Sequence, residues 1–175
     1  MADSVLVPSL VIEPLDPKIH DRAQFDCGEA SLNSWLREFA GQAMKKDSAR
    51  TYVACDEGRV VGYYSLCTFS VERAVAPKHL QFGPHEIPAL LLARLAVDAS
   101  RQGDGLGSLL LLDALRVSTL VADAVGARVM VVHALHEKAG AFYSEQGFRP
   151  FESDPLALYL PMNDIRATLT AAGMS

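Results

Sequence analysis

A glycine-rich junction at residues 94–111, RLAVDASRQGDGLGSLLL, has the clearest capacity for binding chemistry in this sequence. A β-like run precedes it and a leucine-rich helix follows it, so several backbone N–H groups and the positive end of a helix dipole would meet at one point. Such a point binds phosphate. Gly105 and Gly107 would let an anion approach the backbone closely, and Arg101 could add a cation beside it. Glycines that only cap and turn the chain are the alternative interpretation.

Two other phosphate-binding patterns do not fit the junction. The stretch GDGLGS at 103–108 does not complete the GxGxxG pattern of a Rossmann site, and no N-terminal βαβ unit opens the chain. A Walker loop requires glycine and lysine followed by serine or threonine, and this sequence lacks that run. An anion site at this junction would therefore be of another kind.

Neither metal nor disulfide chemistry is expected. Cys27, Cys55 and Cys67 are odd in number and lack CxxC spacing, so they indicate buried or free thiols. His133 and His136 form an HxxH pair that could hold a metal only if other ligands converged on it. We expect no metal site.

Length and composition predict one folded domain spanning residues 1–175. Half of the residues are hydrophobic while charged residues remain plentiful, as in a soluble protein. The N-terminal MADSVLVPSL carries an acid and no basic segment, and no apolar run approaches the roughly 18 residues that a membrane span needs. We expect a cytoplasmic chain without membrane contact.

The net charge limits the partners of the chain. Sixteen basic and 21 acidic residues give a formal charge of −5, which argues against wholesale coating by nucleic acid but permits a local basic patch. Residues 37–50 are the best candidate for such a patch, with four basic against two acidic side chains. Its basic residues are Arg37, Lys45, Lys46 and Arg50. A solvated helix face is the alternative interpretation.

The elements that must position these residues form a mixed pattern. An apolar stripe of Leu110, Ala114, Val117, Val121 and Ala124 predicts a long helix after the junction, which Gly126 can stop. Ser31 is a possible cap of an earlier helix, and residues 76–88 form a long, turn-rich connection. Strands are predicted at 6–12, 51–55, 60–70, 90–97, 128–134 and 156–160, and helices at 32–39, 105–126 and 138–146. The order predicts an α/β (α+β mixed) fold with one antiparallel hairpin.

The motifs carry a resemblance to a known family. QGDGLG at 102–107 resembles the QxxGxG acyl-CoA pyrophosphate loop of the GNAT family of N-acetyltransferases. Downstream, the family pattern NxxAxxxY with a trailing GF is similar to His136, Ala139 and Tyr143 followed by EQGF at 145–148. Further stretches resemble one GNAT branch, the TacT/AtaT-type toxins: FDCG at 25–28, LNSWL at 32–36, RTYV at 50–53, VGYY at 61–64 and RLAVD at 94–98. The likeness covers nearly the whole chain.

The resemblance implies a GNAT fold, a twisted, mixed and mostly antiparallel sheet flanked by helices, which binds acetyl-CoA and acetylates an amine. For the toxin branch it implies transfer of acetyl to the α-amine of an aminoacyl-tRNA, which blocks translation, and a ribbon-helix-helix antitoxin as partner. We also expect a homodimer. The residues expected to bind acetyl-CoA are Leu95, Ala96, Val97, Arg101, Gln102, Gly103, Asp104, Gly105, Leu106, Gly107, Ser108, His136, Ala139 and Phe142.

Tyr143 is the candidate catalytic residue. It resembles the family's tyrosine near the sulfur, and a neutral phenol could donate a proton to the departing thiolate. The strand at 94–97 would supply backbone groups to the pantetheine arm and an N–H to the oxyanion. Arg94 could face substrate phosphate or an acidic neighbour, and joins Arg37, Lys45, Lys46 and Arg50 as a candidate for tRNA contact.

The sequence departs from the family pattern at four points. The most serious is the acidic net charge, because tRNA binding normally relies on Lys and Arg side chains that neutralise phosphates. Asp104 stands where related loops often carry a basic residue, and would repel a pyrophosphate unless it points away. His136 replaces the usual asparagine, and no general base stands out. Two alternatives therefore stay open. One is an acetyltransferase of a small amine or a protein N-terminus, and the other is a catalytically idle acyl-CoA-binding module.

Overall fold

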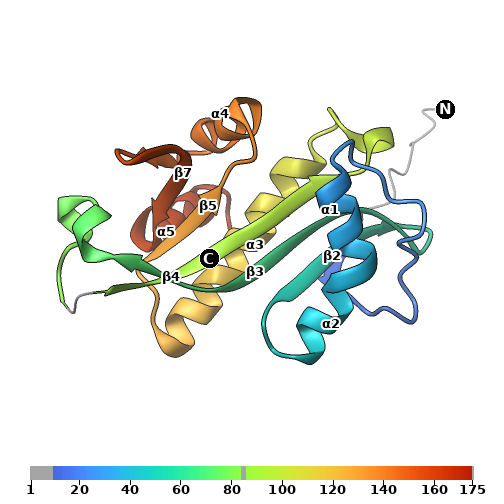
Figure 1. Cartoon of the computed structure of the whole chain (residues 1–175), viewed down its shortest axis with the longest axis horizontal. Coiled ribbons are helices and arrows are strands. Elements are labelled where there is room, and N and C mark those ends of the chain that lie inside the picture. Colours follow the sequence, from blue (N-terminus) through green and yellow to red (C-terminus); the bar gives the residue numbers. More distant parts are fainter. Residues whose placement is uncertain (1–9, 84–85, 175) are drawn as a thin grey trace.

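The computed structural model describes residues 10–83 and 86–174, and its strands join into one seven-stranded sheet of order β1-β2-β3-β4-β5-β7-β6 (Figure 1). Neighbouring strands are antiparallel except β4 and β5, which run parallel. The strands are β1 Ile12–Pro14, β2 Arg50–Asp56, β3 Arg59–Glu72, β4 Glu86–Val97, β5 Val129–His133, β6 Arg149–Phe151 and β7 Asp154–Pro161. The expected mixed, mostly antiparallel sheet flanked by helices is confirmed.

Helices cover both faces of this sheet. The helices are α1 Ala30–Ser34, α2 Ala40–Lys45, α3 Leu106–Val125, α4 Glu137–Glu145 and α5 Met162–Ala171. A π-helical turn, Trp35–Phe39, joins α1 to α2, and short 3₁₀ turns lie at Arg73–Val75, Lys78–Leu80 and Ala99–Arg101. One apolar cluster unites α3 and α5 with one face, and another places α1 and α2 on the opposite face (Figure 1). None of the helices in the described ranges is long and apolar enough to cross a membrane.

The long helix α3 matches its sequence prediction closely. Gly105 precedes it with φ +90°, a conformation that residues with a Cβ rarely adopt, and Gly126 ends it. The helix approaches β3 at Gly62, where a Cβ would lie 2.8 Å from Leu110 Cδ1. Glycine at this position therefore sets how closely α3 packs on the sheet.

The structure differs from the prediction in several places. The helix expected at 32–39 continues through a π-helical turn into α2, and the last residues of the connection expected at 76–88 belong to β4. The helix after the FDCG stretch begins at Ala30 with Glu29 as its N-cap, so Ser31 lies in the first turn and is not the cap. The strand expected at 6–12 falls largely outside the described residues, and β1 starts at Ile12. Helix α5 and strand β6 were not predicted. Strand β6 is three residues long and contains a proline, which resembles a turn in the sequence.

Candidate functional site

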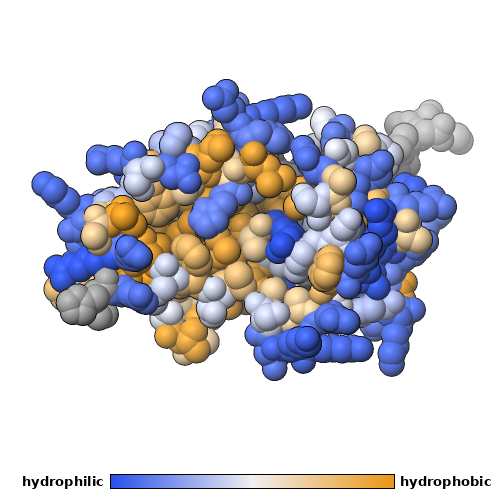
Figure 2. Space-filling model, in the orientation of Figure 1, coloured by the Kyte–Doolittle hydropathy of each residue, from blue (hydrophilic) through white to orange (hydrophobic). Residues whose placement is uncertain are grey.

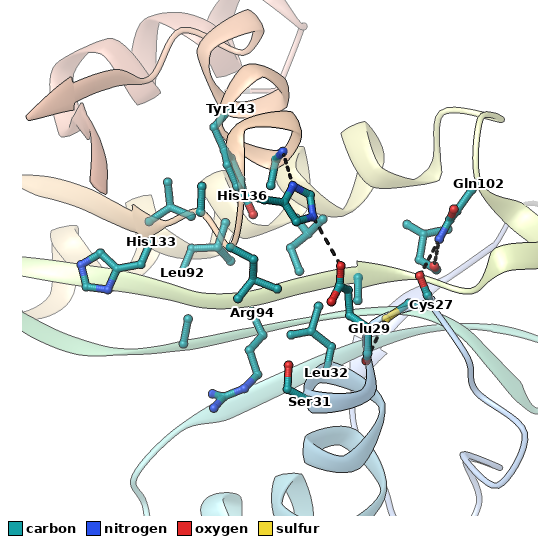
Figure 3. A pocket seen from close by; sticks show the side chains of 18 residues that line it. Cys27, Glu29, Ser31, Leu32, Leu92, Arg94, Gln102, His133, His136 and Tyr143 are labelled. Atoms are coloured by element: carbon teal, nitrogen blue, oxygen red, sulfur yellow. Dashed lines mark hydrogen bonds and ion pairs between the residues drawn. The ribbon is translucent and has the colours of Figure 1, made fainter. Parts of the chain in front are cut away.

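The central feature of the site is an opening between β4 and β5. Their parallel ladder pairs Ala89–Leu92 with Val129–Val132 and then stops, although β4 continues to Val97. A register shift in the β3–β4 ladder lies at this point, beside Ala93. Such an irregularity bends a strand, so β4 turns away from β5. A cavity of about 340 Å³ occupies the opening (Figure 3).

The backbone of β4 presents unpaired groups to this cavity. Asp98 N–H donates to Val61 O at 2.8 Å, so Asp98 bonds toward β3. Residues of an antiparallel strand alternate in the edge to which their N–H and C=O point. Leu95 and Val97 therefore direct these groups to the opposite edge, where β5 no longer pairs. Of these four groups, Val97 C=O accepts from the side-chain amide of Gln102, and within the described chain the other three stay open toward the cavity. This is the arrangement expected for a strand that binds an extended, amide-bearing ligand.

The cavity brings together residues from four parts of the chain. Of the predicted site residues, it is lined by Arg94, Leu95, Ala96, Val97, Gln102, His136, Ala139 and Tyr143. Sequence reasoning missed the remaining lining residues, which are Cys27, Glu29, Ser31, Leu32, Leu92, Ala93, Val132, His133, Ala134 and Leu135. The FDCG stretch was recognised as a resemblance, but nothing in it indicated that the residues after it would face Tyr143.

The segment before α1 is tied to the end of β4. Asp26 N–H donates to Asp98 Oδ2 at 3.0 Å, and Ala99 N–H donates to Asp26 O at 2.8 Å. The side-chain amide of Gln102 donates to Cys27 O at 3.0 Å and to Val97 O at 2.9 Å. Gln102 therefore serves as a brace between these segments, and the bonds hold the N-terminal segment against the cavity.

The turn leading into α3 exposes backbone donors. Gly103 and Gly105 both have positive φ, at +84° and +90°. Within the described ranges, no hydrogen-bond acceptor contacts the N–H groups of Gly105, Gly107 or Ser108. Ser108 is exposed, so this end of the helix is open to an anion. Three free donors at the N-terminus of a 20-residue helix fit a phosphate group.

The charges of this turn are already paired. Arg101 Nε lies 2.8 Å from Asp104 Oδ2, and Arg101 Nη1 lies 3.5 Å from Asp56. The hydrogen bond from Arg101 lowers the pKa of Asp104 below its usual value. Asp104 Oδ1 also accepts at 3.2 Å from the N–H of Leu106, the first residue of α3, whose side chain is buried in the core. Asp104 thus occupies the N–H of Leu106 and neutralises Arg101, the cation that was predicted to help an anion bind.

Helix α4 packs its first turns onto this loop. A Cβ at Gly107 would lie 3.8 Å from Val97 Cγ2 and 3.9 Å from the Phe142 ring. Phe142 is half-buried, and its ring lies 5.2 Å from that of Tyr143 in an edge-to-face arrangement. Ala139 lines the cavity one turn earlier. Phe142 therefore packs against Gly107 on one side and against the ring of Tyr143 on the other.

Tyr143 is buried, yet its hydroxyl stays available. The side chain is 6% exposed and packs against Phe142 and Phe148. In the described chain the hydroxyl has no hydrogen-bond partner, and it is not among the fully enclosed unpaired oxygens. The oxygen therefore opens into the cavity. Burial raises the pKa of Tyr143 above that of an ordinary phenol, so the group is neutral and holds its proton at physiological pH.

His136 acts as the N-cap of α4. Its Nδ1 accepts from Ala139 N–H at 3.1 Å, and its Nε2 lies 3.4 Å from Glu29 Oε1. Figure 3 shows the two side chains meeting across the cavity, His136 from the α4 side and Glu29 from the α1 side. The histidine that replaces the usual asparagine therefore keeps a capping role and adds a contact with a carboxylate.

Arg94 lies on the other face of β4 from Leu95 and Val97, because side chains alternate along a strand. Its guanidinium stacks on the Trp35 ring, with 4.1 Å from Cζ to the ring centroid. Within the described residues it has no carboxylate or other hydrogen-bond acceptor as partner. Partial burial lowers the pKa of Arg94 from its usual value, but a guanidinium remains charged. The cavity thus contains a cation without a protein counter-ion.

The basic residues of 37–50 divide into two pairs. Arg37 donates to Phe25 O at 2.9 Å, and Arg50 donates to Met44 O at 3.1 Å and pairs with Asp47 at 2.6 Å. Lys45 and Lys46 are exposed at the C-terminal end of α2. Figure 1 shows that this end of α2 points away from α4. The two lysines are thus separate from the cavity.

The surface around the cavity is uneven in polarity. Figure 2 shows apolar side chains gathered over the middle of the sheet, where β4 and β5 lie in Figure 1, whereas the α1–α2 side is largely polar. Leu135, at the mouth of the cavity, is 55% exposed.

Across the described residues, no three His, Cys, Asp or Glu side chains gather as a metal site would require.

Comparison with known proteins agrees with this geometry. The acetyltransferase (GNAT) domain matches residues 47–150. A tRNA-acetylating toxin of Mycobacterium tuberculosis (strain ATCC 25618 / H37Rv) is 44% identical over 150 residues, which cover 85% of this chain and 90% of that protein. The chain belongs to the GNAT acetyltransferase family. The resemblance seen in the motifs at 102–107 and 136–148 is thereby confirmed.

Other relatives of this GNAT acetyltransferase are similar along nearly their whole length. A probable toxin TacT of Sinorhizobium fredii (strain NBRC 101917 / NGR234) is 35% identical over 171 residues, covering 91% of this chain and 94% of that protein. The structure of AtaT complexed with acetyl-methionyl-tRNAfMet shares 36% identity and superimposes with a TM-score of 0.83, covering 90% of this chain and 98% of AtaT. A tyrosine-to-phenylalanine mutant of KacT shares 34% identity, with a TM-score of 0.85 and coverage of 90% and 98%.

Proposed function

We propose that this GNAT chain, one catalytic domain over residues 1–175, transfers acetyl from acetyl-CoA to the α-amine of an aminoacyl-tRNA and so blocks translation. The observation that carries the proposal is the cavity between β4 and β5, where the free phenol of Tyr143 meets the unpaired edge of β4. Relatives named as a tRNA-acetylating toxin and as AtaT complexed with an acetylated aminoacyl-tRNA support the choice of acceptor.

The donor fits the side of the cavity that faces α3 and α4. The N–H groups of Gly105, Gly107 and Ser108 have no acceptor within the described chain and would hold the pyrophosphate. The outward N–H and C=O of Leu95 and the N–H of Val97 would bond the amides of the pantetheine arm, which leads the thioester toward Tyr143. A solved AtaT structure with antitoxin and acetyl-CoA supports this donor.

The acceptor fits the opposite face of β4. Leu95 and Val97 pack with the α3 cluster, whereas Ala96 packs with the α1–α2 cluster and Arg94 stacks on Trp35 beside it. Donor and acceptor therefore approach the opening from different sides. Arg94, a cation without a protein counter-ion, would hold a phosphate near the 3′ end of the acceptor. The exposed Lys45 and Lys46 would contact the body of the tRNA, together with Arg37 and Arg50.

The chemistry needs a proton at the sulfur and donors for the carbonyl oxygen. Tyr143 supplies the proton, because its buried phenol stays neutral. A backbone N–H of the free β4 edge supplies the oxyanion contact, since it is fixed by the strand and needs no reorganisation. Acetyl transfer forms a nitrogen–carbon bond and breaks the carbon–sulfur bond, and the sulfur leaves with the electron pair and takes the Tyr143 proton.

The test is acetylation of charged tRNA by the purified protein with labelled acetyl-CoA. Label should appear on aminoacyl-tRNA and not on the deacylated form, which lacks the nucleophile, and translation in an extract should stop. Label on polyamines or peptide N-termini instead of charged tRNA would select the small-amine or protein acetyltransferase. Acetyl-CoA binding without transfer to any of these amines would select the idle binding module.

Two partners complete the proposal. A ribbon-helix-helix antitoxin is supported by the AtaT structure solved with the C-terminus of its antitoxin AtaR. A homodimer is supported by apolar side chains on the outside of α3, where Leu109, Leu120 and Val125 are 56%, 57% and 79% exposed. Light scattering on the protein alone should give the mass of two chains, and substitution of Leu120 by aspartate should reduce it to one if α3 forms the contact.

A further inference from the structure

The carboxylate of Glu29 lies in the cavity where the amine must react. Within 10–83 and 86–174, Glu29 is the one acidic residue that lines this cavity. Its backbone carbonyl accepts from Leu32 and Asn33 N–H groups at 3.1 Å each, so the start of α1 fixes its position. Its side chain is 47% exposed. The carboxylate therefore lies in the cavity beside His136 and still has access to solvent.

The other titratable groups at the cavity are less suited to accept the proton. His133 also lines the cavity, but it packs edge-on against Phe69 with ring centroids 5.7 Å apart, and Figure 3 shows it at the far end of the cavity from Glu29. His136 uses the lone pair of Nδ1 to accept from Ala139 N–H, so its Nε2 carries the hydrogen and donates toward Glu29. Protonation of this ring would release the cap of α4. Burial raises the pKa of Cys27, which stays a neutral thiol. Asp26 accepts bonds from Gly28 N–H and the Asn33 amide and does not line the cavity.

The acceptor amine requires such a base. An α-amino group has a pKa of about 7.7–8.0 and is mostly an ammonium ion at pH 7, a form that cannot attack a thioester. We propose that Glu29 is the general base of the reaction, binding the α-ammonium and accepting its proton, and that His136 positions the Glu29 carboxylate. This rests on the proposed function in requiring an amine acceptor, but not on the identity of that amine.

The protons balance as follows. The ammonium nitrogen gives one proton to Glu29, which releases it to solvent through its exposed side. The freed lone pair forms the nitrogen–carbon bond, and the carbon–sulfur bond breaks with its electron pair on sulfur. Tyr143 protonates the sulfur, and the second proton lost by the nitrogen returns to Tyr143 through water. One acetamide, one free thiol and one solvent proton result.

Two matched variants separate a base from a mere contact. Glu29→Gln keeps an oxygen that can accept from His136 Nε2–H but cannot take a proton. His136→Asn keeps a good N-cap for α4 and removes the contact with Glu29. Circular dichroism should match wild type in both variants. Acetyl-CoA affinity by calorimetry should match wild type in Glu29→Gln, because Glu29 supplies neither the free helix donors nor the β4 edge.

The decisive readout is the pH profile of kcat/KM from pH 6 to pH 9 on aminoacyl-tRNA. At pH 7, kcat/KM of Glu29→Gln should be about 10²-fold lower than that of wild type. By pH 9 the amine is already deprotonated in solution, so the ratio of the wild-type kcat/KM to that of the variant should shrink roughly tenfold. His136→Asn should lose much less and keep the wild-type profile. A constant ratio across pH, or equal losses in the two variants, would overturn the role of Glu29 as base.

The same design keeps the two proposals apart. If wild type does not label charged tRNA, the proposed acceptor fails, and the profile is measured on whichever amine, polyamine or peptide N-terminus, wild type does acetylate. If wild type labels charged tRNA and Glu29→Gln is equally active at pH 7, only the proposal for Glu29 fails.

Discussion

Replacement of Tyr143 by phenylalanine isolates the proton that the proposed mechanism requires. The ring packs against Phe142 and Phe148, and phenylalanine retains these contacts. The hydroxyl has no hydrogen-bond partner within the described chain, so its removal leaves no buried donor or acceptor unpaired. We therefore expect the free energy of unfolding to change by less than about 1 kcal/mol.

The catalytic effect should be far larger than the effect on stability. General acid catalysis contributes about 10²–10⁴-fold, which corresponds to roughly 2.7–5.4 kcal/mol of activation free energy at about 1.36 kcal/mol for each factor of ten. Because the proposed mechanism places Tyr143 at the sulfur and not at the pyrophosphate, acetyl-CoA affinity should stay near that of wild type. The loss should therefore appear in kcat.

The pH dependence gives an independent check. Burial raises the pKa of Tyr143 above the usual value near 10, and the protonated form is the active one. Activity should thus persist as the pH rises through the range where an ordinary phenol ionises, with no alkaline loss near pH 10 attributable to this group. If wild-type activity falls at alkaline pH and this fall is absent in Tyr143→Phe, the pKa of Tyr143 is lower than its burial implies.

The assay is single-turnover acetyl transfer with saturating acetyl-CoA, accompanied by calorimetry and thermal unfolding. Tyr159→Phe is the matched control, because Tyr159 is also buried but packs on Phe151 and does not line the cavity. It should leave kcat unchanged. Wild-type turnover in Tyr143→Phe, or an equal loss in the control, would refute the assignment of Tyr143 as the acid.

Four further outcomes follow from the structure. Gly107→Glu should abolish acetyl-CoA binding, because it places a carboxylate at the free helix donors. Asp104→Asn keeps the bond to the helix but removes the charge, so it should tighten acetyl-CoA binding in the same calorimetric titration. Gly62→Val should destabilise the fold by about 1–3 kcal/mol in urea titration, because a side chain there meets α3. Replacing Lys45 and Lys46 with glutamine should weaken tRNA binding, spare acetyl-CoA binding and flatten the salt dependence of tRNA affinity, and an unchanged salt slope would exclude them from the contact.

Short-range signals identified much of this protein from its sequence. The bounds of α3 follow from glycines that adopt positive φ at one end and stop the helix at the other, which depends only on local backbone sterics. The spacing of His136, Ala139 and Tyr143 on one helix also follows from local periodicity. Helix α5 carries a similar signal, Met162, Ile165 and Leu169, which the sequence prediction overlooked.

The strand at 94–97 was expected to offer backbone groups to a ligand, but the local sequence does not show that its edge at Leu95 and Val97 is left unpaired by β5. This free edge exists because β4 bends away from β5, and the whole of helix α3 separates these two strands in the sequence. The same run of residues would be an ordinary buried strand if β5 paired along its full length. Strand pairing is a long-range contact, and the local pattern of apolar residues does not encode where it ends.

The electrostatics of the site were likewise decided by packing. Asp104 alone would repel an anion, but in the fold it pairs with Arg101 and caps α3, so its charge is largely balanced. Glu29 meets His136 only because the segment before α1 is bonded to the end of β4. The sequence determined the family, the phosphate turn and the tyrosine, since these are local motifs. Tertiary structure alone decided which carboxylate lines the cavity together with that tyrosine, because groups distant in the chain meet only through the packing between them.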